Sequence, residues 1–298
     1  MKKIPSFKNS SICAAAFGVA LTLNSHAALV IWGGSDGQYT TGANWVGGSV
    51  PNTNGGDTAQ INSGNVTYTP GGDLAIHSGG VLHVNGGSWT QSGGIAWIQM
   101  GGGTLSVTGG VFNQGTAGNI VRNAASSITV GGGIANFSGN FLHDSTNLGA
   151  FSITGGTVNV ANEFKPLTTF TLAGGSLTAN LISFADGPGS IDFDSGNIAV
   201  NGAGFYSGFY GGGSKSLNFT SGSTGSLFFS TYTLADLAAD GFLTNGTIRY
   251  NGAISGGSFS ATESGGGVII TAVPEPTSPV FFLAGAAAVL YRRRRFQR

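Results

Sequence analysis

Leu105-Ser106-Val107-Thr108-Gly109-Gly110 is the stretch that decides the fold of this chain. Apolar and polar residues alternate over its first four positions, which is the period of a β-strand with one buried face. The glycine pair that follows is typical of a sharp change of direction, because glycine readily adopts a positive φ. The unit therefore predicts a short, half-buried strand that ends at a turn.

Similar units recur along the middle of the chain at intervals of about 19 to 24 residues. They begin at Leu82, Leu105, Ile128, Phe151 and Phe170, and a degenerate sixth copy covers residues 191–196. Repeats of this length are typical of solenoids, in which each repeat stacks on its neighbours and a fully buried aliphatic side chain contributes about 1.5–3 kcal/mol. Stacking is expected to bury one apolar residue of each repeat at an equivalent inward position: Leu82, Leu105, Ile128 and Ile153.

The glycine pairs are compatible with two architectures. As two-residue hairpin turns they would produce an antiparallel sheet, whereas as bends between the faces of a coil they would produce a parallel solenoid. About a dozen small polar residues separate successive units, which is enough for a coil to travel round and return. We therefore expect an all-β, right-handed parallel β-solenoid (β-helix) and keep the antiparallel sheet as the alternative.

The ends of this body are expected to be capped. The predicted parts are an N-terminal cap with the first strands (28–70), the glycine-pair repeats (71–230) and a C-terminal cap (231–272). Trp32 and Trp45 mark the first cap. In the second, Thr233 is expected to begin a short helix over residues 234–240 that ends at Gly241. Leu234, Leu237 and Phe242 would pack on the last coil, and residues 247–250 and 267–271 would form closing strands.

Residues 1–27 have the pattern of a secretory signal peptide. Lysines at positions 2, 3 and 8 precede an apolar run over residues 12–23, and Ser25-His26-Ala27 supplies small residues at the cleavage positions. Cleavage is expected between Ala27 and Ala28. The only cysteine, Cys13, lies in this leader, so the exported body would have no disulfide.

Residues 273–298 carry three features in a set order. The first feature is the motif Val273, Pro274, Glu275 and Pro276. It is expected to be extended, because each proline disfavours helix in the residue before it. Residues 279–291 are expected to form a short transmembrane helix, although about 12 apolar residues are fewer than the roughly 20 of a comfortable span. The membrane stop that follows would stay on the cytoplasmic side; it consists of Arg292, Arg293, Arg294 and Arg295.

These features resemble the PEP-CTERM sorting signal of Gram-negative bacteria. The resemblance implies that an exosortase-type membrane protease recognises the Pro274–Pro276 tripeptide and processes the chain near it. The protein would then be a precursor anchored transiently in the inner membrane, and afterwards a component of the cell surface or extracellular matrix. A plain C-terminal anchor without processing is the alternative. The glycine-pair units are also similar to autotransporter passenger repeats.

The central body is sparsely charged. The whole chain has a formal net charge of +0 with 8% charged residues. Between residues 28 and 272 the basic residues are outnumbered about threefold by Asp and Glu; they are Arg122, Lys165, Lys215 and Arg249. A mildly acidic body is a poor partner for nucleic acid. Its surface is expected to consist mostly of Ser, Thr, Asn and Gly, whose groups hydrogen-bond to water and sugars, so extracellular polysaccharide is the expected partner.

No catalytic motif is present in the sequence, and neither an enzyme nor a cofactor is expected. The histidines of the body, His77, His83 and His143, lack metal-ligand spacing. Asp192 and Asp194 alternate with an apolar residue on one predicted strand and would face solvent together. They are the weak candidate for a calcium site, and solvated strand residues are the favoured interpretation.

Phe205, Tyr206, Phe209 and Tyr210 form an aromatic cluster in a glycine-rich stretch. Exposed rings would stack on sugars, whereas buried rings would fill the core or edge of the solenoid. The expected function is that of an exported structural or adhesive protein of the cell envelope or polysaccharide matrix. The alternatives are a carbohydrate-binding module and a polysaccharide lyase or hydrolase on a β-helix; the lyase would require a positioned base and a carboxylate cluster for calcium.

Overall fold

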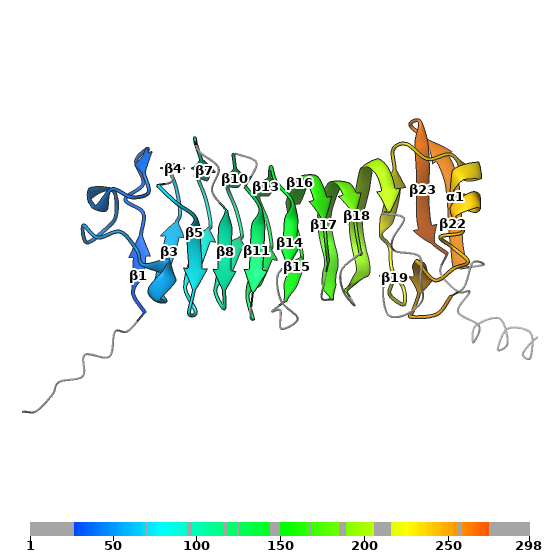
Figure 1. Cartoon of the computed structure of the whole chain (residues 1–298), viewed down its shortest axis with the longest axis horizontal. Helices are drawn as coiled ribbons and strands as arrows, with labels where there is room; N and C mark the ends of the chain where they lie inside the picture. The colour runs from blue at the N-terminus through cyan, green and yellow to red at the C-terminus, as the bar shows by residue number, and fades with distance from the viewer. Residues whose placement is uncertain are drawn as a thin grey trace, which may run out of the picture.

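The computed structural model describes residues 27–273, apart from 70, 94–96, 116–117, 124, 144–149, 167–168, 185–188, 206–215 and 255–257. This part of the chain forms an elongated rod whose strands lie across the long axis (Figure 1). The predicted signal peptide before Ala27, the sorting tripeptide, the membrane segment and the arginines lie outside the described residues. Ala27, Ala28 and Val273 are described and exposed. No helix of the described part is long and apolar enough to span a bilayer.

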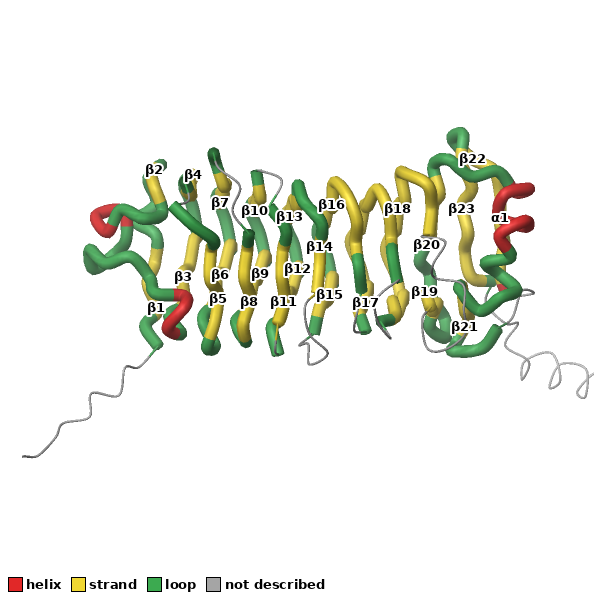
Figure 2. Tube along the Cα trace, viewed as in Figure 1, coloured by secondary structure: helices red, strands yellow, loops and turns green. Residues whose placement is uncertain are grey.

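Three ladders of parallel strands form the sides of the rod (Figure 2). The first ladder is β1 (Leu29–Ile31), β3 (Thr58–Ile61), β6 (Val81–Val84), β9 (Thr104–Val107), β12 (Ser127–Val130), β15 (Phe151–Ile153), the beginnings of β17 (Phe170–Ile182) and β18 (Ser190–Phe205), β19 (Ser216–Phe219) and β21 (Ile248–Tyr250).

The second ladder lies beyond the glycine turns. It is β2 (Gly37–Gln38), β4 (Asn65–Tyr68), β7 (Ser88–Gln91), β10 (Val111–Gln114), β13 (Ile134–Phe137), β16 (Thr157–Phe164), the middles of β17 and β18, and β20 (Ser226–Phe229). The third ladder is β5 (Leu74–His77), β8 (Ile98–Gly101), β11 (Ile120–Asn123), β14 (Phe141–His143) and the ends of β16, β17 and β18.

The glycine pairs are bends between ladders and not hairpin turns. β9 and β10 flank Gly109-Gly110, yet β9 pairs with β6 and β12 while β10 pairs with β7 and β13, in parallel in every case. The parallel β-solenoid is therefore confirmed, and the antiparallel alternative is wrong for these repeats. The polar stretches between the glycine-pair units contain strands of the second and third ladders.

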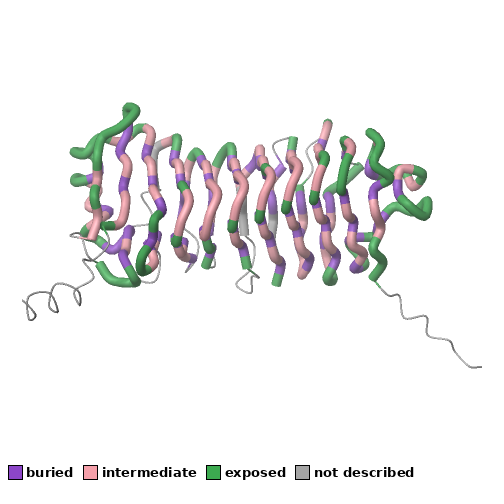
Figure 3. The backbone as a smooth tube through the Cα atoms, turned by 180° about the vertical axis from the view of Figure 1, so that it is seen from behind, coloured by how far each residue is buried: buried purple, intermediate pink, exposed green. Residues whose placement is uncertain are grey.

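Register brings like residues together inside the rod. Leu82 pairs with Leu105, Leu105 with Ile128, and Ile128 with Phe151. The prediction that Ile153 continues this row is wrong, because Ile153 pairs with Val130 two positions further along the strand. Both rows are nevertheless fully buried. Buried and half-buried positions alternate along the strands (Figure 3), as expected for a sheet with one face in the core.

Aromatic rings continue the core along the second ladder. Trp89 stacks on Phe112 with ring centroids 4.7 Å apart. At the N-terminal end, Trp45 contacts Trp32 and Tyr39 edge-on, with centroids 5.0 and 5.1 Å away. The Trp45 Nε1–H donates to the carbonyl oxygen of Tyr39 at 2.7 Å. These rings, with the 3-10 turns η1 (Gly42–Asn44) and η2 (Thr53–Gly55), close this end of the core.

The C-terminal end is closed by α1 (Leu234–Asp240) and by the antiparallel pair β22 (Phe259–Ser264) and β23 (Gly267–Ala272). β23 also pairs with β20 in antiparallel orientation. The helix begins and ends as predicted, with Thr233 as N-cap and Gly241 as C-cap. Leu237 and Phe242 are buried, but the prediction for Leu234 is wrong, since this first residue of the helix is 40% exposed.

Candidate functional site

A row of hydrogen-bonded side chains runs along the outer face of the second ladder. Asn113 donates to Thr90 Oγ1 at 3.2 Å, Asn136 to Asn113 Oδ1 at 2.6 Å, and Asn159 to Asn136 Oδ1 at 2.7 Å. The parallel register causes this row, because it places the outward residues of β7, β10, β13 and β16 directly beside one another. We call these four residues the amide row.

A groove of about 370 Å³ lies beside the amide row. Its lining residues are neutral: five carry side-chain amides, two carry hydroxyls and three are apolar. They are Gln114, Asn136, Phe137, Ser138, Asn159, Val160, Ala161, Thr178, Asn180 and Asn201. We call this site the amide groove. Its volume falls within the range of small-molecule sites, about 300–1,000 Å³.

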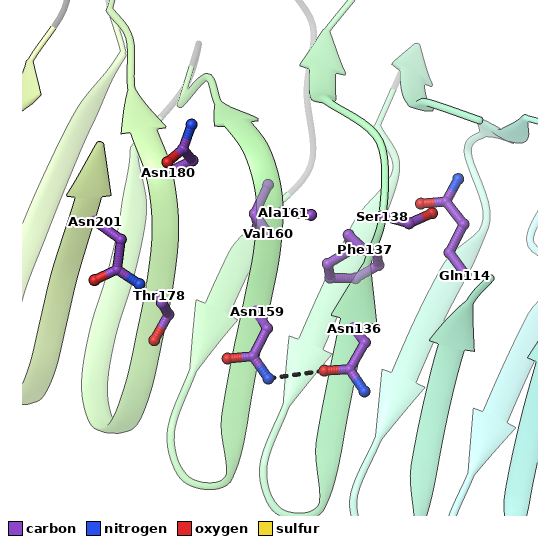
Figure 4. Close-up of a pocket in the computed structure, with 10 residues that line it drawn as sticks. All are labelled: Gln114, Asn136, Phe137, Ser138, Asn159, Val160, Ala161, Thr178, Asn180 and Asn201. Carbon is purple, nitrogen blue, oxygen red and sulfur yellow. Dashed lines mark hydrogen bonds between the residues drawn. The ribbon is translucent and has the colours of Figure 1, made fainter. Parts of the chain in front are cut away.

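Two parallel lines of residues shape the groove (Figure 4). Asn136, Asn159 and Thr178 form one line, since they occupy the same position on β13, β16 and β17. Two residues further along each strand stand Ser138, Ala161 and Asn180. Serine and alanine are small, which leaves room at the surface between the asparagine side chains.

Gln114 lies at one end of the groove and is 2% exposed. Its Nε2–H donates to the carbonyl oxygen of Gly118 at 2.6 Å. The amide oxygen Oε1 is buried and accepts no hydrogen bond within the described part of the chain; in Figure 4 it lies on the side of Ser138. An unpaired buried carbonyl costs about 1–3 kcal/mol of stability, so this atom is a ready acceptor for a donor that enters the groove.

A second polar row lies at the bend between the first and second ladders. Asn85 donates to Asn62 Oδ1 at 3.3 Å, and the Thr108 hydroxyl donates to Asn85 Oδ1 at 2.8 Å. His83 Nε2 lies 2.9 Å from the same hydroxyl. We call Asn62, Asn85 and Thr108 the bend row; none of them lines the amide groove.

The predicted calcium candidates each contact the neighbouring rung. Asp192 is half-buried, and its Oδ1 accepts from Asn218 Nδ2 at 3.1 Å. Asp194 is exposed, and its Oδ1 accepts from the Thr220 hydroxyl at 3.0 Å. Across the described residues, no group of three or more His, Cys, Asp or Glu side chains comes together as a metal site would require. The two aspartates therefore lie as polar strand residues.

The aromatic cluster falls mostly outside the described residues. Tyr206, Phe209 and Tyr210 are not described, and Phe205 is placed only as the last residue of β18. Among the histidines, His77 is half-buried beside Gly101, and its Nε2 accepts or donates no hydrogen bond within the described part. His143 is placed only as the last residue of β14. Among these candidates, none whose side chain the structure describes lines the amide groove.

A further cavity of about 380 Å³ lies between the start of α1 and the β22–β23 turn. Its carboxylate, Glu263, already accepts from the backbone N–H of Leu234 at 3.2 Å. Glycines 265, 266 and 267 form much of the remaining wall, which leaves few side-chain groups to recognise a ligand. The amide groove therefore offers more hydrogen-bonding side chains than this cavity.

The architecture defines the class of the protein, an all-β parallel solenoid. No family model, curated protein or solved structure matches the chain.

The residues of the amide groove were not predicted as a site from the sequence. A signal was present, because Asn113, Asn136 and Asn159 follow one another at the period of the glycine-pair repeats. Aligning the stretches after the glycine pairs would have revealed the row. The contribution of Gln114 and Asn180 follows only from the folded arrangement.

Proposed function

We propose that this chain is an exported structural or adhesive protein of the cell envelope or extracellular polysaccharide matrix. Its right-handed solenoid would act as a rigid, weakly charged rod, and not as an enzyme. The observation that carries this proposal is the amide row, because it repeats a neutral side-chain amide on three successive rungs, at Asn113, Asn136 and Asn159. Weak contacts repeated along a rod add through multivalency.

The ends of the sequence support the proposed location. The leader would be removed between Ala27 and Ala28, and the motif Val273-Pro274-Glu275-Pro276 would direct the precursor to an exosortase-type protease in the inner membrane of a Gram-negative bacterium. Arg292 to Arg295 would hold the end of the precursor on the cytoplasmic side until processing. The rod would then remain at the cell surface or in the matrix.

Mass spectrometry of the mature chain tests this proposal. The full chain is expressed with an exosortase in a Gram-negative host, and its termini are determined in the surface and matrix fractions. We expect a start at Ala28 and an end near Pro276. Replacing Pro274, Glu275 and Pro276 by alanine should leave an unprocessed, membrane-bound precursor. Recovery of the unexported chain in the cytoplasm, or identical processing of the triple variant, would refute the proposed sorting.

The amide groove favours a carbohydrate-binding role as the second candidate function. A hydrolase or lyase is supported less well, because none of the described residues that line the groove carries the acidic or basic side chain that glycosidic chemistry requires. Asp192 and Asp194 do not line it.

A further inference from the structure

We propose that the amide groove binds a segment of a neutral polysaccharide, with the glycan chain lying along the axis of the rod. This inference rests on the proposed function, because an extracellular location brings the groove into contact with polysaccharide. The described residues that line this site are different from those of the aromatic cluster predicted at residues 205–210.

The chemistry of the groove selects an uncharged ligand. None of its lining residues in the described part is charged, so an anionic or cationic ligand would lose hydration without gaining a counter-charge. Side-chain amides have two N–H donors and an oxygen with two lone pairs. A sugar hydroxyl both donates and accepts, and the groove presents both functions side by side.

The amide row is held in position before any ligand arrives. Asn136 uses one N–H to bond to Asn113 and accepts one from Asn159. By valence, its second N–H and its second lone pair remain free to face outward. Because hydrogen bonds within the row already fix these side chains, ligand binding costs little further rotamer entropy. Fixing a side chain in advance saves about 0.5–1.5 kcal/mol of binding free energy.

Three groups in the groove lack partners that a glycan would supply. Gln114 Oε1 is buried and accepts no hydrogen bond from the described residues. Asn180 and Asn201 are exposed, and neither side chain forms a hydrogen bond in the described part of the chain. The three residues belong to different rungs, since Gln114 lies in β10, Asn180 in β17 and Asn201 in β18. Together they offer contacts along the groove rather than at one point.

The direction of the groove favours a polymer over a single sugar. It crosses β10, β13, β16, β17 and β18, and neighbouring parallel strands lie about 4.8 Å apart. A chain of sugar residues along the axis would meet amides on several rungs in succession. Ala161 is exposed and supplies an apolar contact for the C–H face of a sugar ring.

Isothermal titration calorimetry on the full-length chain tests the proposal. The probes are cellohexaose, maltohexaose and mannohexaose, with hexagalacturonic acid as the charged counterpart. We expect at least one neutral hexasaccharide to bind and the anionic probe to bind at least about tenfold more weakly. Asn180→Ala and Asn201→Ala should each weaken binding about 3- to 10-fold, which corresponds to one hydrogen bond lost. Gln114→Leu should weaken it similarly.

Asn85→Ala is the matched control. Asn85 is also an exposed asparagine, but it belongs to the bend row and does not line the groove. It should bind the hexasaccharide like the unmodified chain. Gln114→Leu also removes the bond to Gly118, so its circular dichroism and unfolding temperature are compared with those of the unmodified chain. Asn180→Ala and Asn201→Ala alter exposed side chains and keep the test valid if Gln114→Leu does not fold.

The outcomes separate this inference from the proposed function. Binding that survives all three groove substitutions, preference for the anionic probe, or failure of every neutral probe to bind would overturn the groove assignment. Such a result would leave export and surface retention intact, because these are read from the mature termini and the cell fractions. A chain that binds neutral hexasaccharides through the groove but stays in the cytoplasm would uphold the site and refute the proposed location.

Discussion

At the scale of single residues, the bend at Gly133 shows why the repeats depend on glycine. Its φ is 66°, in the left-handed region that L side chains rarely adopt. A Cβ at this position would also meet the carbonyl oxygen of Gly110 on the preceding rung. The neighbouring rungs are therefore stacked too closely at the bend to admit any side chain.

Gly133→Ala is expected to destabilise the rod by about 2–4 kcal/mol, the sum of a left-handed residue and an overpacked contact. Gly79→Ala is the matched control. Gly79 has a φ of 83° but nothing within 4 Å of its added Cβ, so only the conformational cost of about 1–2 kcal/mol applies. Urea unfolding followed by circular dichroism measures both. Equal losses of stability for the two variants would show that the close contact between rungs at Gly133 adds no cost of its own.

At the scale of elements, α1 begins at the capping residue that the sequence predicts, Thr233. The Thr233 hydroxyl accepts from the backbone N–H of Asp236 at 3.2 Å, and Asp236 Oδ2 accepts from the backbone N–H of Thr233 at 2.9 Å. This reciprocal capping satisfies N–H groups that a helix start leaves unpaired. The hydrogen bonds from the Thr233 side chain and backbone lower the pKa of Asp236 from its usual 3.8.

The pH dependence of this cap follows from the direction of that shift. A carboxylate whose pKa is lowered by folding stabilises the folded state above its unfolded pKa of 3.8. The contribution disappears as the pH falls through the lowered value. Thr233→Ala should return the Asp236 pKa toward 3.8, because the side-chain bond is the largest cause of the shift.

Carbon-13 NMR of the Asp236 carboxyl group during an acid titration measures this pKa directly. Thr244→Ala serves as the control, since Thr244 lies beyond the helix and bonds to Gly241. An Asp236 pKa that is the same with and without Thr233 would contradict the assigned capping.

At the scale of the whole molecule, the fold was largely predictable from the repeats. Alternation in stretches such as Leu105–Val107 predicted strands, and the glycine pairs predicted their ends. Spacing alone left hairpins and bends open, since glycine serves both. Strands of the third ladder such as β11 were not predicted, because Ile120-Val121-Arg122-Asn123 does not alternate between apolar and polar residues. The row of Leu82, Leu105 and Ile128 was predicted, but its continuation through Ile153 was wrong by two residues.

The groove was less accessible to sequence reasoning. The repeat of Asn113, Asn136 and Asn159 is visible in the chain, but an Asn row forms a site only where small residues leave space beside it. That space depends on Ser138 and Ala161 lying next to the row in adjacent rungs. The burial of Gln114 Oε1 depends in turn on the folded arrangement, in which the side-chain N–H of Gln114 donates to Gly118. Such three-dimensional conditions have no counterpart in a linear motif.

The central claim is that each repeat adds one parallel rung to a rod. The first ladder provides equivalent positions, because His83 is separated from Thr171, Asp192 and Asn218 by four, five and six rungs. Spin labels on cysteines introduced at these pairs, in a chain with Cys13→Ser, report the separations by pulsed electron paramagnetic resonance. Circular dichroism of each labelled chain confirms that the label leaves the fold intact.

We predict distances of about 19, 24 and 29 Å, which rise by about 4.8 Å for each rung. Hairpins laid side by side would place two strands in each repeat, so the increment would be about 10 Å. An increment of that size, or distances that do not rise steadily from Thr171 to Asn218, would contradict the parallel rod.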